Sequence, residues 1–308
     1  MRLSVIRCAC LGLSLALVIS APVSATVYDA PPGAVPTSLL AGDVLNIGAG
    51  RSTTSSFTAA TGSLINVVGG TVALSAAPLN SDANVYSGFF QPAQVNGAVN
   101  VYGGTADSFT FGKLLNVFGG SVGSGSLFFM PANATLNLYG GSVGNNAHVD
   151  KDTVNILGGT MGLPFPPFDA KFNMSAGNFI GAAFFGASVF NLSGGILTNP
   201  NLNLQDTSKM NITGWSFLLN GAPIPGLSVN NPVVITSRNV VLTGTLVDGA
   251  NFTGNITAPS PGAGVATTAT ITVFLVPEPS TLGLIFISSF STLVRRKRTS
   301  RGRFAAAL

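Results

Sequence analysis

Val99-Asn100-Val101-Tyr102-Gly103-Gly104 decides the fold of this chain, because the same pattern returns along most of its length. Clear copies are Ile65-Asn66-Val67-Val68-Gly69-Gly70, Leu115-Asn116-Val117-Phe118-Gly119-Gly120, Leu136-Asn137-Leu138-Tyr139-Gly140-Gly141 and Val154-Asn155-Ile156-Leu157-Gly158-Gly159. Shorter copies contain Asn46, Asn84, Asn173, Asn191 and Asn211. Successive asparagines are 20, 18, 16, 16, 21, 18, 18, 18 and 20 residues apart. Such a period indicates a repeat architecture, with one short strand in each unit.

The period predicts an all-β fold, a parallel β-solenoid of about ten coils of about 18 residues each. Strand alternation sends the apolar neighbours of each asparagine, such as Leu115 and Val117, to one face, and Asn116 and Phe118 to the other. Stacked asparagines can form a side-chain amide ladder, and Gly-Gly suits a sharp corner. A β-sandwich or antiparallel meander remains the alternative, because Gly-Gly also marks turns there.

The repeats end at Asn211, so we assign the solenoid to residues 26–211. Residues 212–275 are interpreted as a C-terminal β cap, with longer strands in 233–246 and 265–274 and a turn at 251–255. Such a cap would shield the last coil, whose open edge invites aggregation.

Residues 276–303 combine three signals. The motif Pro277-Glu278-Pro279 holds the only glutamate of the 308 residues. An apolar segment follows at 282–294, and then the basic cluster Arg295-Arg296-Lys297-Arg298. The segment is short against the roughly 17–25 residues that span a bilayer, but snorkelling arginines extend it to a transmembrane helix. The arginines would lie on the cytoplasmic side.

This order resembles the PEP-CTERM sorting signal of Gram-negative bacteria. The resemblance implies recognition, and cleavage near the motif, by exosortase, a membrane transpeptidase-like enzyme. It implies transient anchoring in the inner membrane and then a place in the cell envelope, on the outer surface or outside the cell. Proteins of this family accompany exopolysaccharide production, so the implied context is an extracellular matrix or biofilm.

The N-terminus predicts export independently. Residues 1–25 combine early arginines, an apolar stretch at 11–19 and a small-residue cleavage site ending at Ala25, which is typical of a secretory signal peptide. Both cysteines, Cys8 and Cys10, lie within it. The mature protein would therefore have neither a disulfide nor a thiolate metal site.

The basic character of the chain belongs to its ends. The formal net charge is +4, of which residues 1–25 contribute +2 and residues 276–303 contribute +5, six basic residues less Glu278. The body between them therefore carries −3, from six basic residues and nine aspartates. Nucleic-acid binding depends on clustered lysine and arginine, so the sequence excludes it as a function.

The body shows little equipment for catalysis. Glycoside hydrolysis needs two facing carboxylates, but the aspartates are scattered and the body has no glutamate. If extended, His148, Asp150 and Asp152 would share a face and could act as an acid/base or Ca²⁺ site, or simply form a solvated turn. We therefore predict no catalytic residues, no metal and no cofactor. The alternative is a polysaccharide-active enzyme of β-helix fold.

One feature predicts binding. Tyr102, Phe118 and Tyr139 follow the repeated triplet in three units, with Leu157 next, and would stack outward as an aromatic stripe. Aromatic platforms suit sugar rings and protein partners. A loop at 127–130 could instead cover the stripe. The sequence thus predicts an exported non-enzymatic envelope protein, with a polysaccharide-binding module as the alternative.

Overall fold

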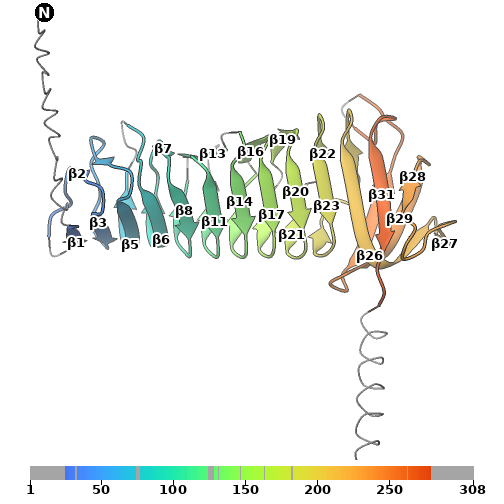
Figure 1. The fold of residues 1–308 in the computed structure, drawn as a ribbon, viewed down its shortest axis with the longest axis horizontal. Helices are drawn as coiled ribbons and strands as arrows, with labels where there is room; N and C mark the ends of the chain where they lie inside the picture. The colour runs from blue at the N-terminus through green and yellow to red at the C-terminus, as the bar shows by residue number, and fades with distance from the viewer. Residues whose placement is uncertain are drawn as a thin grey trace, which may run out of the picture.

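The computed structural model describes residues 25–31, 33–73, 77–107, 109–123, 128–130, 132–145, 147–162, 164–181, 183–261 and 263–278. These residues form a parallel β-solenoid of about nine turns, and no helix occurs among them (Figure 1). The prediction of an all-β parallel β-solenoid is confirmed, with about one turn fewer than expected. The sandwich and meander are excluded, because successive repeat strands pair in parallel.

The first face of the solenoid contains the asparagine repeats, stacked with asparagine on asparagine, as in Asn100↔Asn116↔Asn137. Its strands are β1 (Val27–Ala30), β3 (Val44–Gly48), β5 (Leu64–Val72), β6 (Asp82–Phe90), β8 (Ala98–Val101), β11 (Leu114–Val117), β14 (Thr135–Leu138), β17 (Thr153–Ile156), β20 (Lys171–Met174), β23 (Val189–Leu192) and β26 (Lys209–Leu219). The equal register means that each column of the face repeats one position of the sequence motif.

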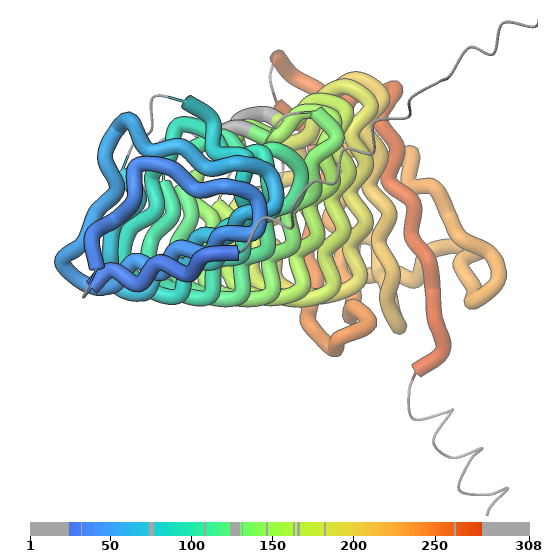
Figure 2. Tube along the Cα trace, turned by 60° about the vertical axis from the view of Figure 1, so that its left-hand side comes forward, coloured from blue at the N-terminus to red at the C-terminus, as the bar shows by residue number. Residues whose placement is uncertain are grey.

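Two further faces close each coil, and Figure 2 looks obliquely along the resulting tube. The second face, after the glycine corner, contains β9 (Thr105–Ala106), β12 (Ser121–Val122), β15 (Ser142–Val143), β18 (Thr160–Met161), β21 (Asn178–Phe179) and β24 (Ile196–Leu197). The third contains β7 (Gln94–Val95), β10 (Thr110–Phe111), β13 (Phe128–Phe129), β16 (Ala147–Asp150) and β19 (Phe165–Phe168). Two separate pairs are β2 (Ser38–Leu39) with β4 (Thr58–Ala59), and β22 (Ala183–Phe184) with β25 (Asn203–Leu204).

The core is one continuous apolar column inside the tube. Both neighbours of each asparagine point inward, and Leu115 and Val117 are fully buried. Burying one such side chain contributes about 1.5–3 kcal/mol. Phe172, Phe184 and Phe190 pack ring against ring in the later coils. Because a coil buries its apolar side chains only against its neighbours, the solenoid is stable as a stack.

The Gly-Gly pairs are required by the corner between the first two faces. A Cβ on Gly103 would lie 2.4 Å from the carbonyl oxygen of Tyr86 in the preceding coil. Gly104 has a φ of +71°, and its Cβ would lie 2.6 Å from the carbonyl oxygen of Gly88. A side chain is therefore excluded by close backbone approach at both positions and by conformation at the second.

The cap begins within β26. Its first half pairs in parallel with β23, and its second half pairs antiparallel with β29 (Val240–Leu246). The remaining cap strands are β27 (Ala222–Pro223), β28 (Val233–Ile235), β30 (Asn251–Ile256) and β31 (Thr270–Leu275). β31 returns to pair in parallel with β26, where Lys209 lies opposite Thr270, and β28 then pairs antiparallel with β31. The last rung of the first face thus comes from far along the chain.

Two expectations for the cap were wrong in detail. Residues 233–246 form two strands, and residues 251–255 belong to β30. The hairpin turn lies earlier, at Asp248-Gly249, where Gly249 has a φ of +88°. Asn255 instead pairs its side chain with Asn201 of the last coil, at 2.9 Å. Asparagine in this chain marks stacked strands more than turns.

Several predicted segments lie outside the described residues. These are the signal peptide up to residue 24, Pro279, the apolar segment at 282–294 and the basic cluster at 295–298. Ala25 begins the described chain, and Pro277 and Glu278 follow β31 near its end. Within the part of the chain that the structure describes, no helix has the length and apolar character needed to cross a membrane.

Candidate binding face of the solenoid

A continuous ladder of side-chain amides runs along the first face. From Asn66 onward, each asparagine donates its Nδ2–H to the Oδ1 of the asparagine one coil earlier, at distances of 2.7 to 3.0 Å. The ladder contains Asn46, Asn66, Asn84, Asn100, Asn116, Asn137, Asn155, Asn173, Asn191 and Asn211. Every bond points in the same direction, so the amide dipoles add along the solenoid.

The donor end of the ladder meets a carboxylate. Asn46 donates from Nδ2 to Oδ1 of Asp29, at 2.6 Å. A carboxylate is a stronger acceptor than an amide, and it suits the positive end of the aligned dipoles. Each ladder bond uses one of the two amide N–H groups and one of the two oxygen lone pairs. The ladder therefore leaves a donor and an acceptor at each rung for a partner.

The predicted aromatic stripe forms, and it contains one ring more than expected. Tyr86, Tyr102, Phe118 and Tyr139 stack in sequence, with centroids 5.0, 4.9 and 4.8 Å apart and interplanar angles of 8° or less. Val68 and Leu157 extend the column at its two ends. These six residues, which we call the aromatic column, are 42% to 51% exposed. The loop does not cover them, because Phe128 and Phe129 form β13 of the third face.

Tyr86 was missed because its unit, Asn84-Val85-Tyr86, continues with Ser87-Gly88 in place of Gly-Gly. The position of Asn84 in the repeat was the available signal, since the residue two places after each asparagine occupies this column.

The stacking determines which part of each ring is accessible. Rings 4.8 to 5.0 Å apart and nearly parallel cover one another's faces, so the edges face solvent. A sugar stacks best on an open ring face. The column therefore presents an apolar ridge with tyrosine hydroxyl groups, and it does not present a row of open platforms.

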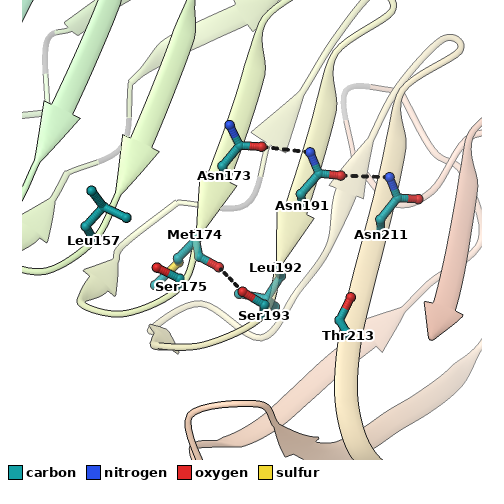
Figure 3. Close-up of a pocket in the computed structure, with 9 residues that line it drawn as sticks. All are labelled: Leu157, Asn173, Met174, Ser175, Asn191, Leu192, Ser193, Asn211 and Thr213. Atoms are coloured by element: carbon teal, nitrogen blue, oxygen red, sulfur yellow. Dashed lines mark hydrogen bonds between the residues drawn. The ribbon is translucent and has the colours of Figure 1, made fainter. Parts of the chain in front are cut away.

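Beyond Leu157 the ridge gives way to a depression of about 370 Å³ (Figure 3). Ser175, Ser193 and Thr213 occupy the same column in the later coils, and their small side chains leave the space open. The amides of Asn173, Asn191 and Asn211 line it alongside, together with Leu157, Met174 and Leu192. The lining therefore combines polar and apolar groups and contains no charged side chain.

His148, Asp150 and Asp152 do not share a face. His148 and Asp150 lie half-buried on the outer side of β16, but Asp152 turns inward and is 2% exposed. Its Oδ1 accepts the N–H of Ala134 at 2.8 Å, and its Oδ2 accepts the N–H of Asp150 at 3.0 Å. The described residues contain no group of three or more histidine, cysteine, aspartate or glutamate side chains placed to hold a metal ion.

Asp152 has a structural role in the corner that precedes the first face. Desolvation by burial raises the pKa of this carboxyl from 3.8 to about 6, although the two backbone N–H groups lower it in part. Buried polar residues recur at the same place, three residues before an asparagine of the ladder. They are Asp43, Ser63, Ser81, Ser188 and Ser208. This recurrence assigns Asp152 to the framework of the solenoid.

Comparison with protein-family models, with curated proteins and with solved structures finds no match to this chain. The proposals below therefore depend on the residues and their geometry.

Proposed function

We propose that this chain is an exported, non-enzymatic protein of the cell envelope or extracellular matrix, processed by exosortase at Pro277-Glu278-Pro279. The support is the order of signals along the chain, namely a signal peptide ending at Ala25, a folded body, and a tail with the motif, an apolar segment and terminal arginines. The tail begins directly after β31, so cleavage there would leave the cap complete.

The observation that carries a structural role is the use of polar side chains inside the framework. The asparagine amides bond to one another. Asp43 accepts backbone N–H groups from Thr26 and Leu40, as Asp152 does from its own neighbours. Side chains held in this way build a long, uniform surface, which suits a matrix protein better than a catalyst.

The experiment is an intact-mass measurement of the mature protein from its native envelope, beside a Glu278→Ala variant. We expect the wild-type mass to lack residues 1–25 and the segment after the motif, and the variant to keep its C-terminal tail. A wild-type protein with an unprocessed C-terminus would contradict processing by exosortase.

The second candidate is polysaccharide binding, and the depression beside Leu157 favours it. Its amide and hydroxyl lining offers donors and acceptors to a polyhydroxylated chain, with an apolar side chain at one end. Exopolysaccharide in the native envelope would be the ligand. Thr213→Tyr should fill the depression and abolish retention on envelope polysaccharide, and Thr105→Tyr on the second face is the matched control.

A further inference from the structure

The charges of the first face are separated along its length. Asp82 is exposed two residues before Asn84, and Lys171 and Lys209 are exposed two residues before Asn173 and Asn211. Strand alternation puts all three on one outward column beside the ladder. Asp29, also exposed, lies at the N-terminal end of the ladder. Acidic groups thus occupy the half of the face near β1, and basic groups occupy the half near β26.

The aromatic column runs along the middle of the face, from Val68 on β5 to Leu157 just after β17, and no described segment covers it. An exposed, contiguous apolar patch on an otherwise polar surface marks an interaction site. The covered ring faces disfavour sugar stacking, whereas a row of ring edges and hydroxyl groups fits a second flat, apolar surface. The charge pattern indicates what that second surface is.

We propose that two copies of this chain pack first face against first face, in antiparallel order, about a twofold axis parallel to the strands and close to β11. Such a rotation keeps the position along each strand, so every column meets its own counterpart, and it reverses the order of the coils. Asp29, five coils before β11, lies opposite the partner's β26, where Asn211 occupies its column and Lys209 lies two residues earlier on the same strand. Asp82, two coils before β11, lies within one coil of the partner's Lys171.

The remaining side chains of the face fit the same arrangement. Phe118 meets its own counterpart at the axis, and Tyr102 meets the partner's Tyr139. The ladder faces the partner's ladder, and the spare N–H and lone pair of each amide are self-complementary. Eleven rungs at roughly 4.8 Å by about 16 Å of strand give about 800 Å² per copy, the usual size of a specific interface. Parallel copies would instead oppose like charges.

Cysteine cross-linking tests the arrangement, since Cys8 and Cys10 are the only native cysteines and both can be changed to serine. In that background Leu114→Cys, on the proposed axis, should form a disulfide dimer with itself in the envelope. Val44→Cys and Val189→Cys, four coils on either side of the axis, should each stay monomeric alone and cross-link to one another when co-expressed. Monomeric Leu114→Cys, or self-linked Val189→Cys, would overturn the proposal.

A surface variant tests the role of the aromatic column. Tyr102→Ser, Phe118→Ser and Tyr139→Ser together should reduce the cross-link yield of Leu114→Cys at least tenfold. Ser175 and Ser193 already occupy this column, and circular dichroism would verify that the variant folds. Lys171→Glu with Lys209→Glu should weaken dimerisation about tenfold. An unchanged cross-link yield in the serine variant would overturn the proposal. The proposal would also be overturned if the wild type and the serine variant were both monomeric and the variant lost retention on polysaccharide. Dimer formation does not depend on export or exosortase processing, which the intact-mass measurement tests separately.

Discussion

The solenoid and its cap complete the same stack of strands by opposite means. In the solenoid each rung repeats one motif, and its strands are joined by parallel pairing, an amide ladder and tight glycine corners. In the cap, the second half of β26 leaves the stack and pairs antiparallel with β29. The first half of β26 pairs in parallel with β31, in which Thr270 lies opposite Lys209, 61 residues earlier in the chain. The repeat is held by many equal short-range bonds, whereas the cap depends on a few long-range ones.

In the cap, hydrogen bonds from the single side chain of Arg238 join separate segments, where the solenoid has its amide ladder. The guanidinium donates to the carbonyl oxygens of Val265 and Ala266 at 3.2 and 3.0 Å, and to that of Thr236 at 3.0 Å. One side chain thereby joins the segment before β29 to the loop before β31. Damage should therefore spread through neighbouring coils in the solenoid and stay local in the cap.

The largest expected effect comes from the corners. Gly120→Ala would place a Cβ 2.5 Å from the carbonyl oxygen of Gly104, at a φ of +72°, and should cost more than about 4 kcal/mol. The control is Gly221→Ala in the cap, where φ is +78° but nothing lies within 4 Å. It should cost about 1 kcal/mol. Denaturant unfolding followed by circular dichroism measures both, and equal costs would contradict the close-packed corner.

The second-largest expected effect is a pH dependence of the free energy of unfolding, caused by the buried carboxyl of Asp152. Below pH 3.8 Asp152 is protonated in both the folded and unfolded states. As the pH rises, the unfolded chain loses this proton first, and above about 6 the folded state carries the buried charge. The group should therefore lower the free energy of unfolding by about 2.5 kcal/mol between pH 4 and 7.

Asp152→Ser isolates this contribution, because serine occupies the same corner at Ser63 and Ser188. The difference in unfolding free energy between the wild type and this variant should change by that amount over the same pH range. A difference that does not vary with pH would show that the carboxyl titrates normally.

Loss of the arginine clamp should be smaller and confined to the cap. Arg238→Met leaves several carbonyl oxygens without their charged donor and should cost about 2 kcal/mol. The only tryptophan, Trp215, lies beside the β29–β30 turn and reports on the cap by fluorescence. We expect hydrogen exchange to rise in 265–275 and to stay unchanged in β14 and β17. Faster exchange throughout the solenoid would contradict local damage.

The smallest expected effect compares the loss of one ladder asparagine with the loss of one isolated asparagine pair. Asn137→Ala removes two ladder bonds, to Asn116 and from Asn155, and should cost about 1–2 kcal/mol. Asn255→Ala removes one exposed bond to Asn201 and should cost about 0.5 kcal/mol. Thermal unfolding of both variants beside the wild type would measure this. A larger cost for Asn255 would show that the ladder contributes little.

Much of the face could be predicted from the sequence because its information is local. The 18-residue spacing gave the parallel stack, and alternation placed Tyr102, Phe118 and Tyr139 outward. Tyr86 followed the same rule but lacked the Gly-Gly signal. The turn assigned to 251–255 failed because asparagine has two uses here, in turns and in stacked strands. Asp152 was placed on the wrong face because alternation does not extend through the corner at Lys151, whose φ is +59°.

The repeat, the register of the ladder and the outward position of the aromatic residues all follow from the local sequence, since each depends on the strand period of two and on one recurring motif. Three features emerge only in the folded chain: the rings cover one another's faces, Asp152 is buried, and β31 completes the last rung. These features depend on the spacing between coils and on contacts between residues far apart in the chain, and local periodicity carries no information about either.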